Sequence, residues 1–362
     1  MPTPTRTRRL ARDHFRALAA RGLRTPIGTD LVLHERPDPE AVRLDGRRLA
    51  AVVREAAERY RTPLAIPLMD LRLEKADLVR RLRPDVGEAD TFHFEAPPSE
   101  ADLDRARETD DAAFLAVHRA QCDAIAELAS RPGLLPFGIS VGPFSLMTKL
   151  LADPIGAVAL AGRGASGADE PLVATAERAL VLAELAVRRS LRAQAGAGAA
   201  AAIVCEPAAS ALFVSPRQMA SGSPVFGRFV LEPLVRLKAQ LDDLGVDLLL
   251  HDCGDPTTGM VEALASRVHP AVLSLGSSRR LWEDAAVVPR DVVLFGNLPT
   301  KHFHSDETLP LEAVRAKTRE LVLKMRETAH PFILGSECDV LHVEEAAATI
   351  RRKVEAMLTE AA

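Results

Sequence analysis

The sequence is poor in cysteine and in aromatic residues. Its 362 residues include only four cysteines, one tryptophan and one tyrosine, and aromatic residues make up 4% of the chain. The cysteines, at positions 122, 205, 253 and 338, are too few and too scattered to form a disulfide framework. Because no secretory signal peptide is recognisable, we expect a reducing, cytoplasmic location in which the thiols serve other roles.

Excess positive charge and long apolar segments are also missing. The formal net charge of −4 argues against nucleic acid as a partner. The small apolar stretch Ala195–Val204 is followed by Glu206 and is too short to span a bilayer, so no membrane partner is expected. Neither a Gly-x-Gly-x-x-Gly motif after a strand nor a Walker loop is present, so no nucleotide site is predicted.

The start of the chain differs from the rest. Residues 5–24 (TRTRRLARDHFRALAARGLR) are rich in arginine, as a transit peptide would be. Asp13 and the absence of a serine-rich stretch favour a surface helix over a transit peptide. We therefore predict an N-terminal helical extension over residues 1–45 and a single catalytic domain over residues 46–362.

Along the remaining chain, short apolar runs alternate with amphipathic stretches. Nearly continuous apolar runs are typical of parallel strands that are covered on both faces. The predicted strands are Pro63–Asp70, Leu134–Val141, Ala201–Glu206, Val246–Asp252, Ala271–Leu275, Asp291–Asn297 and Pro331–Gly335, with an eighth near Thr25–Val32. Helical spacing of apolar residues predicts helices over Asp45–Tyr60, Glu177–Gln194, Phe226–Leu244 and Val343–Leu358.

This alternation predicts an α/β fold, a single (β/α)8 TIM barrel, with a doubly wound sheet as the alternative. The barrel is favoured because polar residues recur at the ends of the predicted strands, where such barrels carry their active sites. We predict Glu206 and Asn297 as catalytic residues and Asp70, Ser140 and Asn297 as substrate-binding residues. Glu206 would be a fourth metal ligand or a base, and hydrogen bonding to the backbone is the alternative for it.

The strongest candidate site combines His251, Cys253 and Cys338. His251 and Cys253 are two residues apart at the end of a predicted strand, so their side chains share a face. Cys338 follows the predicted strand Pro331–Gly335, and its thiol joins the other two if the strand ends meet. One imidazole and two thiols suit Zn²⁺, and three protein ligands leave the fourth position open, as in catalytic zinc sites.

Several segments resemble the uroporphyrinogen decarboxylase superfamily and, within it, the branch of zinc-dependent corrinoid and coenzyme M methyltransferases. The similar segments are PLMDLRLEKADL at 67–78, GISVGPFSLMTKLL at 138–151, CEPAASALFVSPRQM at 205–219, HDCGD at 251–255, FGNLPTKHF at 295–303 and GSECDV at 335–340. The resemblance implies a TIM barrel that holds Zn²⁺ with His251, Cys253 and Cys338. It also implies that a small thiol, such as coenzyme M or homocysteine, is activated as a thiolate and methylated by a corrinoid (cobalamin) carried on a separate protein.

Three other functions stay open. The same site could transfer an alkyl group from an epoxide to the thiol. Metal-free decarboxylation of a porphyrinogen is disfavoured because no arginine-rich segment similar to MRQAGRY is present. A barrel that binds zinc or a corrinoid protein without turnover is the third. Arg279 and Arg280 are candidates for holding an anionic tail of the thiol, and whether the protein forms a homodimer is left open.

Overall fold

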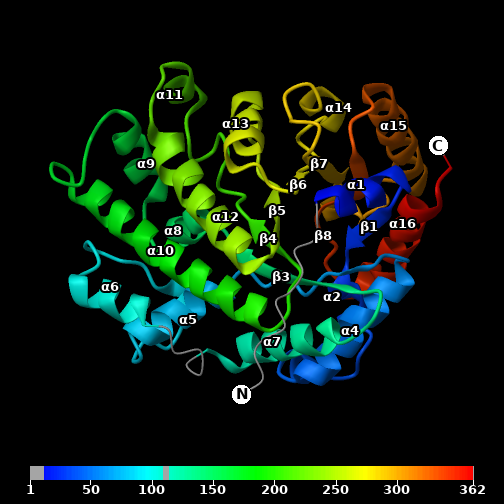
Figure 1. Cartoon of the computed structure of the whole chain (residues 1–362), viewed down its shortest axis with the longest axis horizontal. Helices are drawn as coiled ribbons and strands as arrows, with labels where there is room; N and C mark the ends of the chain where they lie inside the picture. Colours follow the sequence, from blue (N-terminus) through cyan, green and yellow to red (C-terminus); the bar gives the residue numbers. More distant parts are fainter. Residues whose placement is uncertain (1–11, 109–113, 362) are drawn as a thin grey trace.

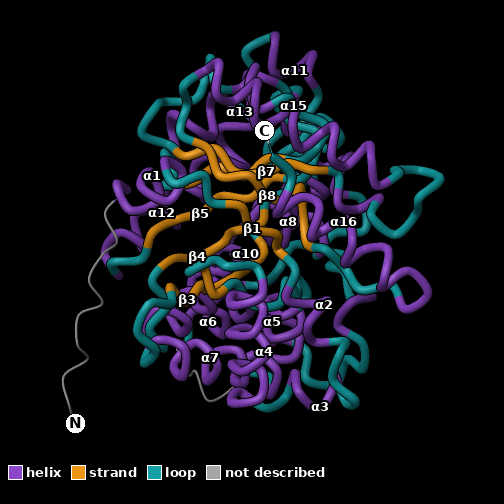
Figure 2. The backbone as a smooth tube through the Cα atoms, turned by 90° about the vertical axis from the view of Figure 1, so that its right-hand side faces the viewer, coloured by secondary structure: helices purple, strands orange, loops and turns teal. Residues whose placement is uncertain are grey.

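The computed structural model describes residues 12–108 and 114–361. Its eight strands are all parallel and form one sheet. They are β1 (Arg24–Ile27), β2 (Leu64–Ala65), β3 (Leu135–Val141), β4 (Ala201–Cys205), β5 (Asp247–Asp252), β6 (Val272–Leu275), β7 (Val293–Leu298) and β8 (Phe332–Asp339). The order across the sheet is β2-β3-β4-β5-β6-β7-β8-β1. The sheet curls around a central axis with helices outside it (Figures 1 and 2), which confirms the predicted TIM-type barrel.

Helices follow most strands and form the outer layer. The longest, α10 (Pro171–Gly196), packs against α8 and α12. The α-helices are α1 (Arg12–Ala20), α2 (Thr29–Leu33), α3 (Pro39–Arg43), α4 (Gly46–Arg59), α5 (Leu73–Leu82), α6 (Glu100–Arg107), α7 (Ala116–Ala129), α8 (Pro143–Lys149), α9 (Pro154–Gly162), α10, α11 (Pro216–Ala220), α12 (Glu232–Leu244), α13 (Thr258–Ala263), α14 (Leu281–Asp284), α15 (Leu311–Thr328) and α16 (Ala347–Thr359).

Between β1 and β2 the barrel has a seam. No hydrogen-bonded ladder joins these two strands within the described ranges. Prolines explain the gap, because Pro26 lies in β1 and Pro63 and Pro67 flank β2, and proline has no N–H to donate to a ladder. A side chain bridges the seam instead, since the hydroxyl of Thr29 donates to the carbonyl of Ile66 at 2.6 Å.

Helix α1 closes the N-terminal end of the barrel. Alternate strand residues such as Phe137 and Ile139 point inward and form an apolar inner core. Phe15 and Leu18 of α1 belong to this same core, and the rings of Phe15 and Phe137 meet edge to face with their centres 6.3 Å apart. The N-terminal helix is therefore not only a surface element, because its apolar face fills one end of the barrel.

The predicted helices are confirmed, with two local details. Asp45 caps α4, because its carboxylate accepts the N–H groups of Arg47 and Arg48. The helical stretch that ends with α12 begins with a wider, π-helical turn over Gly227–Leu231. Pro233, which follows this turn, has no N–H to complete the regular hydrogen-bond pattern.

The strands differ from their predicted extents in three places. The strand predicted over residues 63–70 is only two residues long, because Pro63 and Pro67 on either side of it have no N–H to donate to a ladder. The strand predicted over residues 25–32 ends at Ile27, where the chain turns into α2. In contrast, β8 runs four residues beyond its predicted end, so Cys338 lies inside the strand. Strand β1 lies within residues 1–45 but belongs to the barrel sheet, where it pairs with β8. The division of the chain into residues 1–45 and 46–362 remains a prediction.

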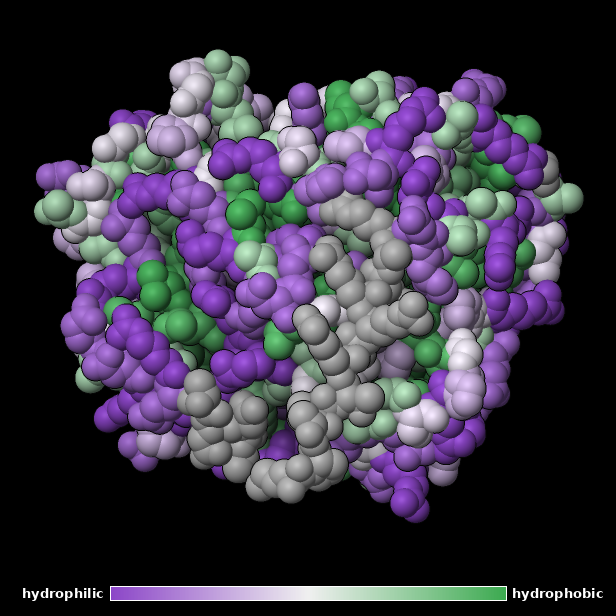
Figure 3. Space-filling model, in the orientation of Figure 1, coloured by the Kyte–Doolittle hydropathy of each residue, from purple (hydrophilic) through white to green (hydrophobic). Residues whose placement is uncertain are grey.

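The face of the molecule seen in Figure 1 is mostly hydrophilic. Figure 3 shows hydrophilic residues over most of the face seen in Figure 1, with hydrophobic residues scattered among them. Among the described residues, no helix has both the length and the apolar character that crossing a membrane requires.

Candidate metal centre

His251, Cys253 and Cys338 come together at the C-terminal end of the barrel. One nitrogen of His251 and the two sulfurs all lie within 4.8 Å of one another. His251 is fully buried, and both cysteines are partly exposed. Strands β5 and β8 are separated in the sheet by β6 and β7, so their ends meet only because the sheet curls. The structure thus brings together the three residues that the sequence predicts as ligands.

The imidazole of His251 is held in one orientation. Its Nδ1 atom lies 2.8 Å from the hydroxyl of Ser274 on β6. Its Nε2 atom is buried and has no hydrogen-bond partner among the described residues. Buried polar atoms normally have a partner, and a metal-binding histidine normally gives its other nitrogen to an orienting group. The orphaned Nε2 therefore fits a metal ligand, with the proton of the neutral ring on Nδ1.

The two thiols are coupled to each other. A hydrogen bond from the Cys253 thiol, together with the neighbouring His251, lowers the pKa of Cys338 to about 4. The same hydrogen bond raises the pKa of Cys253, because losing that proton would place two thiolates side by side. One thiolate therefore forms readily, and the second requires a compensating positive charge, which a divalent metal ion supplies.

Cys338 reaches the cluster because β8 bulges. Thr25 of β1 pairs with Gly335, but Ile27, two residues on, pairs with Asp339, four residues on. Within this irregular stretch the N–H of Ile27 donates to the hydroxyl of Ser336 at 2.9 Å in place of a backbone carbonyl. Bulges of this kind re-aim side chains next to functional sites.

The donor set suits zinc. Zinc binds thiolate sulfur at ~2.3 Å and imidazole nitrogen at ~2.0–2.1 Å, so tetrahedral ligands lie roughly 3.5–4 Å apart. The three ligand atoms, all within 4.8 Å of one another, are close enough to share one zinc ion.

Glu206 lies outside the barrel interior. Its carboxylate accepts the N–H groups of Phe144 and Ser145 and so caps the N-terminus of α8 from a neighbouring strand end. Burial raises the pKa of Glu206 to about 7. Glu206 therefore binds backbone N–H groups, which is the alternative given above for this residue. These contacts do not direct its carboxylate to His251, Cys253 and Cys338.

Ser140 and Asn297 lie near the ends of β3 and β7 and Asp70 lies in the loop before α5, and each is engaged by other residues. The Asn297 amide donates to the carbonyls of Gly276 and Arg279, at 2.7 and 2.9 Å, and so fixes the loop after β6. Asp70 accepts three hydrogen bonds from Arg72, one from its backbone N–H and two from its guanidinium. Ser140 is buried, and Glu74 of α5 contacts it on the helix side of β3.

Arg279 and Arg280 are both paired. The guanidinium of Arg279 binds the carboxylate of Asp284 and the hydroxyl of Thr258. Arg280 is exposed and pairs with Glu283 at 3.0 Å. Neither arginine is directed to the cluster by these contacts.

Two residues near the cluster were not predicted. Ser274 is a buried polar residue in the apolar run AVLSL, and that contrast could have marked it. Glu337 accepts from the hydroxyl of Ser277 at 2.6 Å and from the N–H of Lys301 at 3.3 Å, so it ties together the loops after β6 and β7. No local pattern marks Glu337, because its role depends on the bulge in β8.

Comparison with known proteins places the chain in a family. Residues 39–358 match the family described as uroporphyrinogen decarboxylase (URO-D). The structure is similar to that of a methyltransferase from Methanosarcina mazei, with a TM-score of 0.68 over 94% of this chain and 97% of that chain. The two sequences are 17% identical, so this likeness bears on the fold alone. No curated protein sequence matches significantly. Because the family match spans most of the sequence, the chain belongs to the uroporphyrinogen decarboxylase family.

Proposed function

We propose that this protein is a zinc-dependent methyltransferase that moves a methyl group from a methylated corrinoid protein to a small thiol. The observation that carries the proposal is the cluster of His251, Cys253 and Cys338, in which the Nε2 atom of His251 is buried without a partner. A methyltransferase from Methanosarcina mazei has the same fold, so the proposed reaction is compatible with this architecture.

The charge of the ligand set favours thiol chemistry. When bound, zinc would hold the substrate thiol as a thiolate, which is the nucleophilic form and is scarce for a free thiol at neutral pH. Two cysteinates and one neutral imidazole offset the double positive charge of the ion. The substrate sulfur would then keep the electron density that it needs to attack carbon. An all-nitrogen ligand set would be a stronger Lewis acid, better suited to activating water.

The protein residues around the cluster have separate roles in this proposal. Ser274 orients the imidazole, Glu337 and Asn297 fix the loops after β6 and β7, and the bulge in β8 presents Cys338. The hydrogen bond to Cys338 raises the pKa of Cys253, and the positive charge of Lys301 offsets a small part of that rise, so this lysine acts on the cluster. Since Arg279 is committed to Asp284, Lys301 is the better candidate for an anionic tail of the thiol.

Metal analysis tests the proposed ligands. The double variant Cys253→Ala/Cys338→Ala should lose stoichiometric zinc while keeping the far-UV circular dichroism of the wild type. Cys122→Ala, which changes a cysteine on α7, is the matched control and should keep its zinc. Retention of one zinc per chain by the double variant would exclude these ligands.

Activity is tested by incubating the zinc-loaded protein with methylcobalamin and a panel of small thiols. The expected result is zinc-dependent loss of the methyl–cobalt absorbance together with a methylated thiol. If every thiol fails with methylcobalamin but an epoxide is opened, the alkyltransferase alternative takes its place. Zinc binding without turnover of either electrophile would favour a non-catalytic barrel.

Decarboxylation is the second candidate, because the matching family is named for it. That reaction needs no metal, so the two functions separate cleanly. Metal-free protein that releases CO₂ from uroporphyrinogen would establish the decarboxylase and argue against methyl transfer.

A further inference from the structure

Cys253 and Cys338 are neighbouring thiols as well as candidate metal ligands. Their sulfur atoms lie within 4.8 Å of each other, and the Cys253 thiol donates a hydrogen bond to Cys338. The sulfurs of a disulfide are ~2.05 Å apart, so bond formation requires them to approach by less than about 3 Å. Rotation of one cysteine side chain between staggered conformers moves its sulfur through a comparable distance.

The backbone beside Cys253 is fixed, and its side chain is the part that can turn. Cys253 follows the end of β5, whereas Cys338 lies inside β8. The N–H of Gly254 donates to the Asp252 carboxylate at 2.9 Å, and the N–H of Gly276 donates to the Asp252 carbonyl at 3.0 Å. These hydrogen bonds hold the loop in place, so the two thiols stay at the same edge of the barrel.

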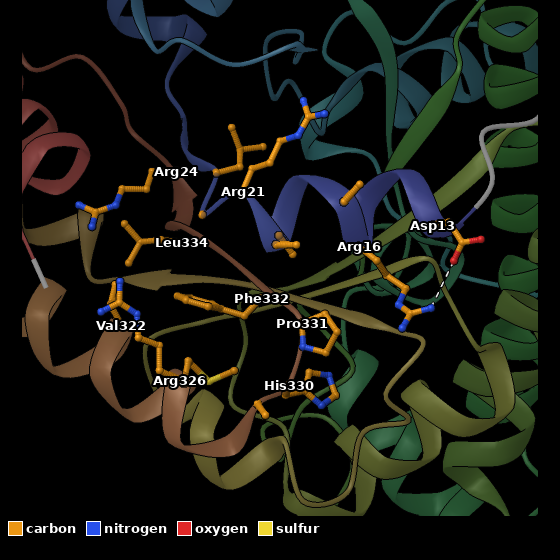
Figure 4. Close-up of a pocket in the computed structure, with 17 residues that line it drawn as sticks. Asp13, Arg16, Arg21, Arg24, Val322, Arg326, His330, Pro331, Phe332 and Leu334 are labelled. Atoms are coloured by element: carbon orange, nitrogen blue, oxygen red, sulfur yellow. Dashed lines mark hydrogen bonds and ion pairs between the residues drawn. The ribbon is translucent and has the colours of Figure 1, made fainter.

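An oxidant reaches the two thiols from the C-terminal end of the barrel. The cavity in Figure 4, of about 990 Å³, lies at the opposite end, where Pro331 and Phe332 at the start of β8 face α1. Cys338 is six residues beyond Phe332, roughly 20 Å away at ~3.3 Å per residue. The apolar inner core fills the barrel between these ends. Both cysteines are partly exposed, so a small peroxide meets them at the C-terminal face.

The fold that holds the two thiols does not depend on a metal. Backbone ladders connect β5 to β8 through β6 and β7. Large apolar clusters lie both inside the barrel and beneath the helices. A chain of 362 residues buries enough apolar surface to fold without a metal. Loss of a metal ion would therefore leave Cys253 and Cys338 side by side.

Two neighbouring thiols can be oxidised in two balanced steps. A hydroperoxide transfers one oxygen atom to the first thiol, which becomes a sulfenic acid, and the rest of the hydroperoxide leaves as an alcohol or, from hydrogen peroxide, as water. The sulfur of the second thiol then bonds to the sulfenic sulfur, and the hydroxyl group leaves with the thiol proton as water. The two sulfurs lose two electrons in total, and the hydroperoxide takes them up.

We propose that Cys253 and Cys338 form a redox switch, in which a hydroperoxide joins them as a disulfide and a dithiol reductant separates them again. A disulfide offers no thiolate, and the thiolate is the form that binds metal. The oxidised site would lose two of its three ligands and release the ion. The inference rests on the proposed function only for what the switch turns off, which is the zinc-dependent reaction.

Treatment of the full-length protein with hydrogen peroxide tests the proposal in the metal-free and the zinc-loaded form. In the metal-free protein, two of the four thiols should disappear, the intact mass should fall by two hydrogen atoms, and peptide mapping should find Cys253 linked to Cys338. In the zinc-loaded protein, the same cross-link should form with release of the zinc to a chromophoric chelator. Dithiothreitol should restore the thiols and the zinc binding.

Cys122→Ala is the matched control, because Cys122 is also partly exposed but lies on α7, outside the cluster. It should form the cross-link as the wild type does. Cys253→Ser should form none, and dimedone should trap a sulfenic acid on Cys338. Sulfinic or sulfonic acid without a cross-link, a cross-link that contains Cys205, or a disulfide between two chains would overturn the proposal. Peptide mapping of the wild type decides this even if the serine variant does not fold.

The result is separable from that of the proposed function. The disulfide needs neither a metal nor a methyl donor, so the cross-link in metal-free protein supports the switch even if zinc-dependent methyl transfer fails. Zinc-dependent methyl transfer by a protein whose Cys253 and Cys338 stay reduced in peroxide would overturn the switch alone.

Discussion

His251 and Ser274 are joined by a 2.8 Å hydrogen bond between Nδ1 and the serine hydroxyl. Ser274 lies on β6, directly beside His251 on β5. Both side chains are fully buried, so no water competes for this contact. The hydrogen bond selects which nitrogen of the ring faces the two cysteines, and the proposed zinc site depends on that choice.

Ser274→Ala should weaken zinc binding by roughly 10–100-fold, because the imidazole loses the group that sets its tautomer and orientation. Competition with a chromophoric chelator measures the affinity. Ser130→Ala, which removes an exposed hydroxyl at the end of α7, should leave the affinity unchanged. Equal affinities in all three proteins would show that Ser274 does not position the ligand.

Gly335→Ala should destabilise the protein by about 1–3 kcal/mol, because it forces extra volume into a packed core. A Cβ atom at this position would lie 2.3 Å from the ring of Phe295. Urea unfolding measures the loss in the free energy of unfolding. In Gly259→Ala the new Cβ atom meets nothing within 4 Å, so that variant should be at least as stable as the wild type. A Gly335 variant of wild-type stability would mean that the barrel interior is less tightly packed than described.

Glu206→Gln should change how stability depends on pH. Burial raises the pKa of Glu206 from 4.5 to about 7. Between these values the unfolded chain has released a proton that the folded protein keeps, so this group makes the free energy of unfolding fall as the pH rises. Glutamine cannot ionise, and the variant should therefore gain stability relative to the wild type as the pH rises from about 5 to about 8.

The measurement for Glu206→Gln is a series of urea unfolding curves across that pH range. Glu307→Gln, at an exposed position, serves as the control and should follow the wild type. Parallel pH profiles for the Glu206 variant and the wild type would show that Glu206 is ionised throughout.

Phe15→Ala should lower the free energy of unfolding by about 3–5 kcal/mol, as expected for deleting a buried phenylalanine. Phe15 is 1% exposed and fills the N-terminal end of the barrel. Leu323→Ala, at a leucine that is 49% exposed on α15, should change it by less than about 0.5 kcal/mol. A small effect of Phe15→Ala would indicate that α1 is not needed to close the barrel.

The alternation of side chains along a strand explains how much of the site could be predicted from the sequence. Side chains two apart share a face, which links His251 and Cys253 directly. The position of Cys338 could not be derived in that way, because it depends on the curl of the sheet and on the bulge at Ser336. Its assignment rested on the condition that the two strand ends meet and on the resemblance to a family, and the geometry of the three residues agrees with it.

Glu206 shows what strand alternation leaves undetermined. The strands of a parallel barrel are apolar on both faces, so the sequence does not tell which face points inward. Val204 lies in the core beneath the helices and Cys205 in the inner core. Glu206, which shares a face with Val204, therefore meets α8 and not the barrel interior. The fold as a whole was more predictable, because the number and order of apolar runs already favour the barrel.

Helix α1 fills the N-terminal end of the barrel, and this bears on the order in which substrates bind at the C-terminal end. The barrel interior is packed with apolar side chains and α1 covers its N-terminal end, so a substrate reaches the cluster only from the C-terminal end. In the proposed reaction the thiol and the methyl donor must share that end. A protein large enough to carry a corrinoid would cover it on docking, so the thiol would have to be in place first.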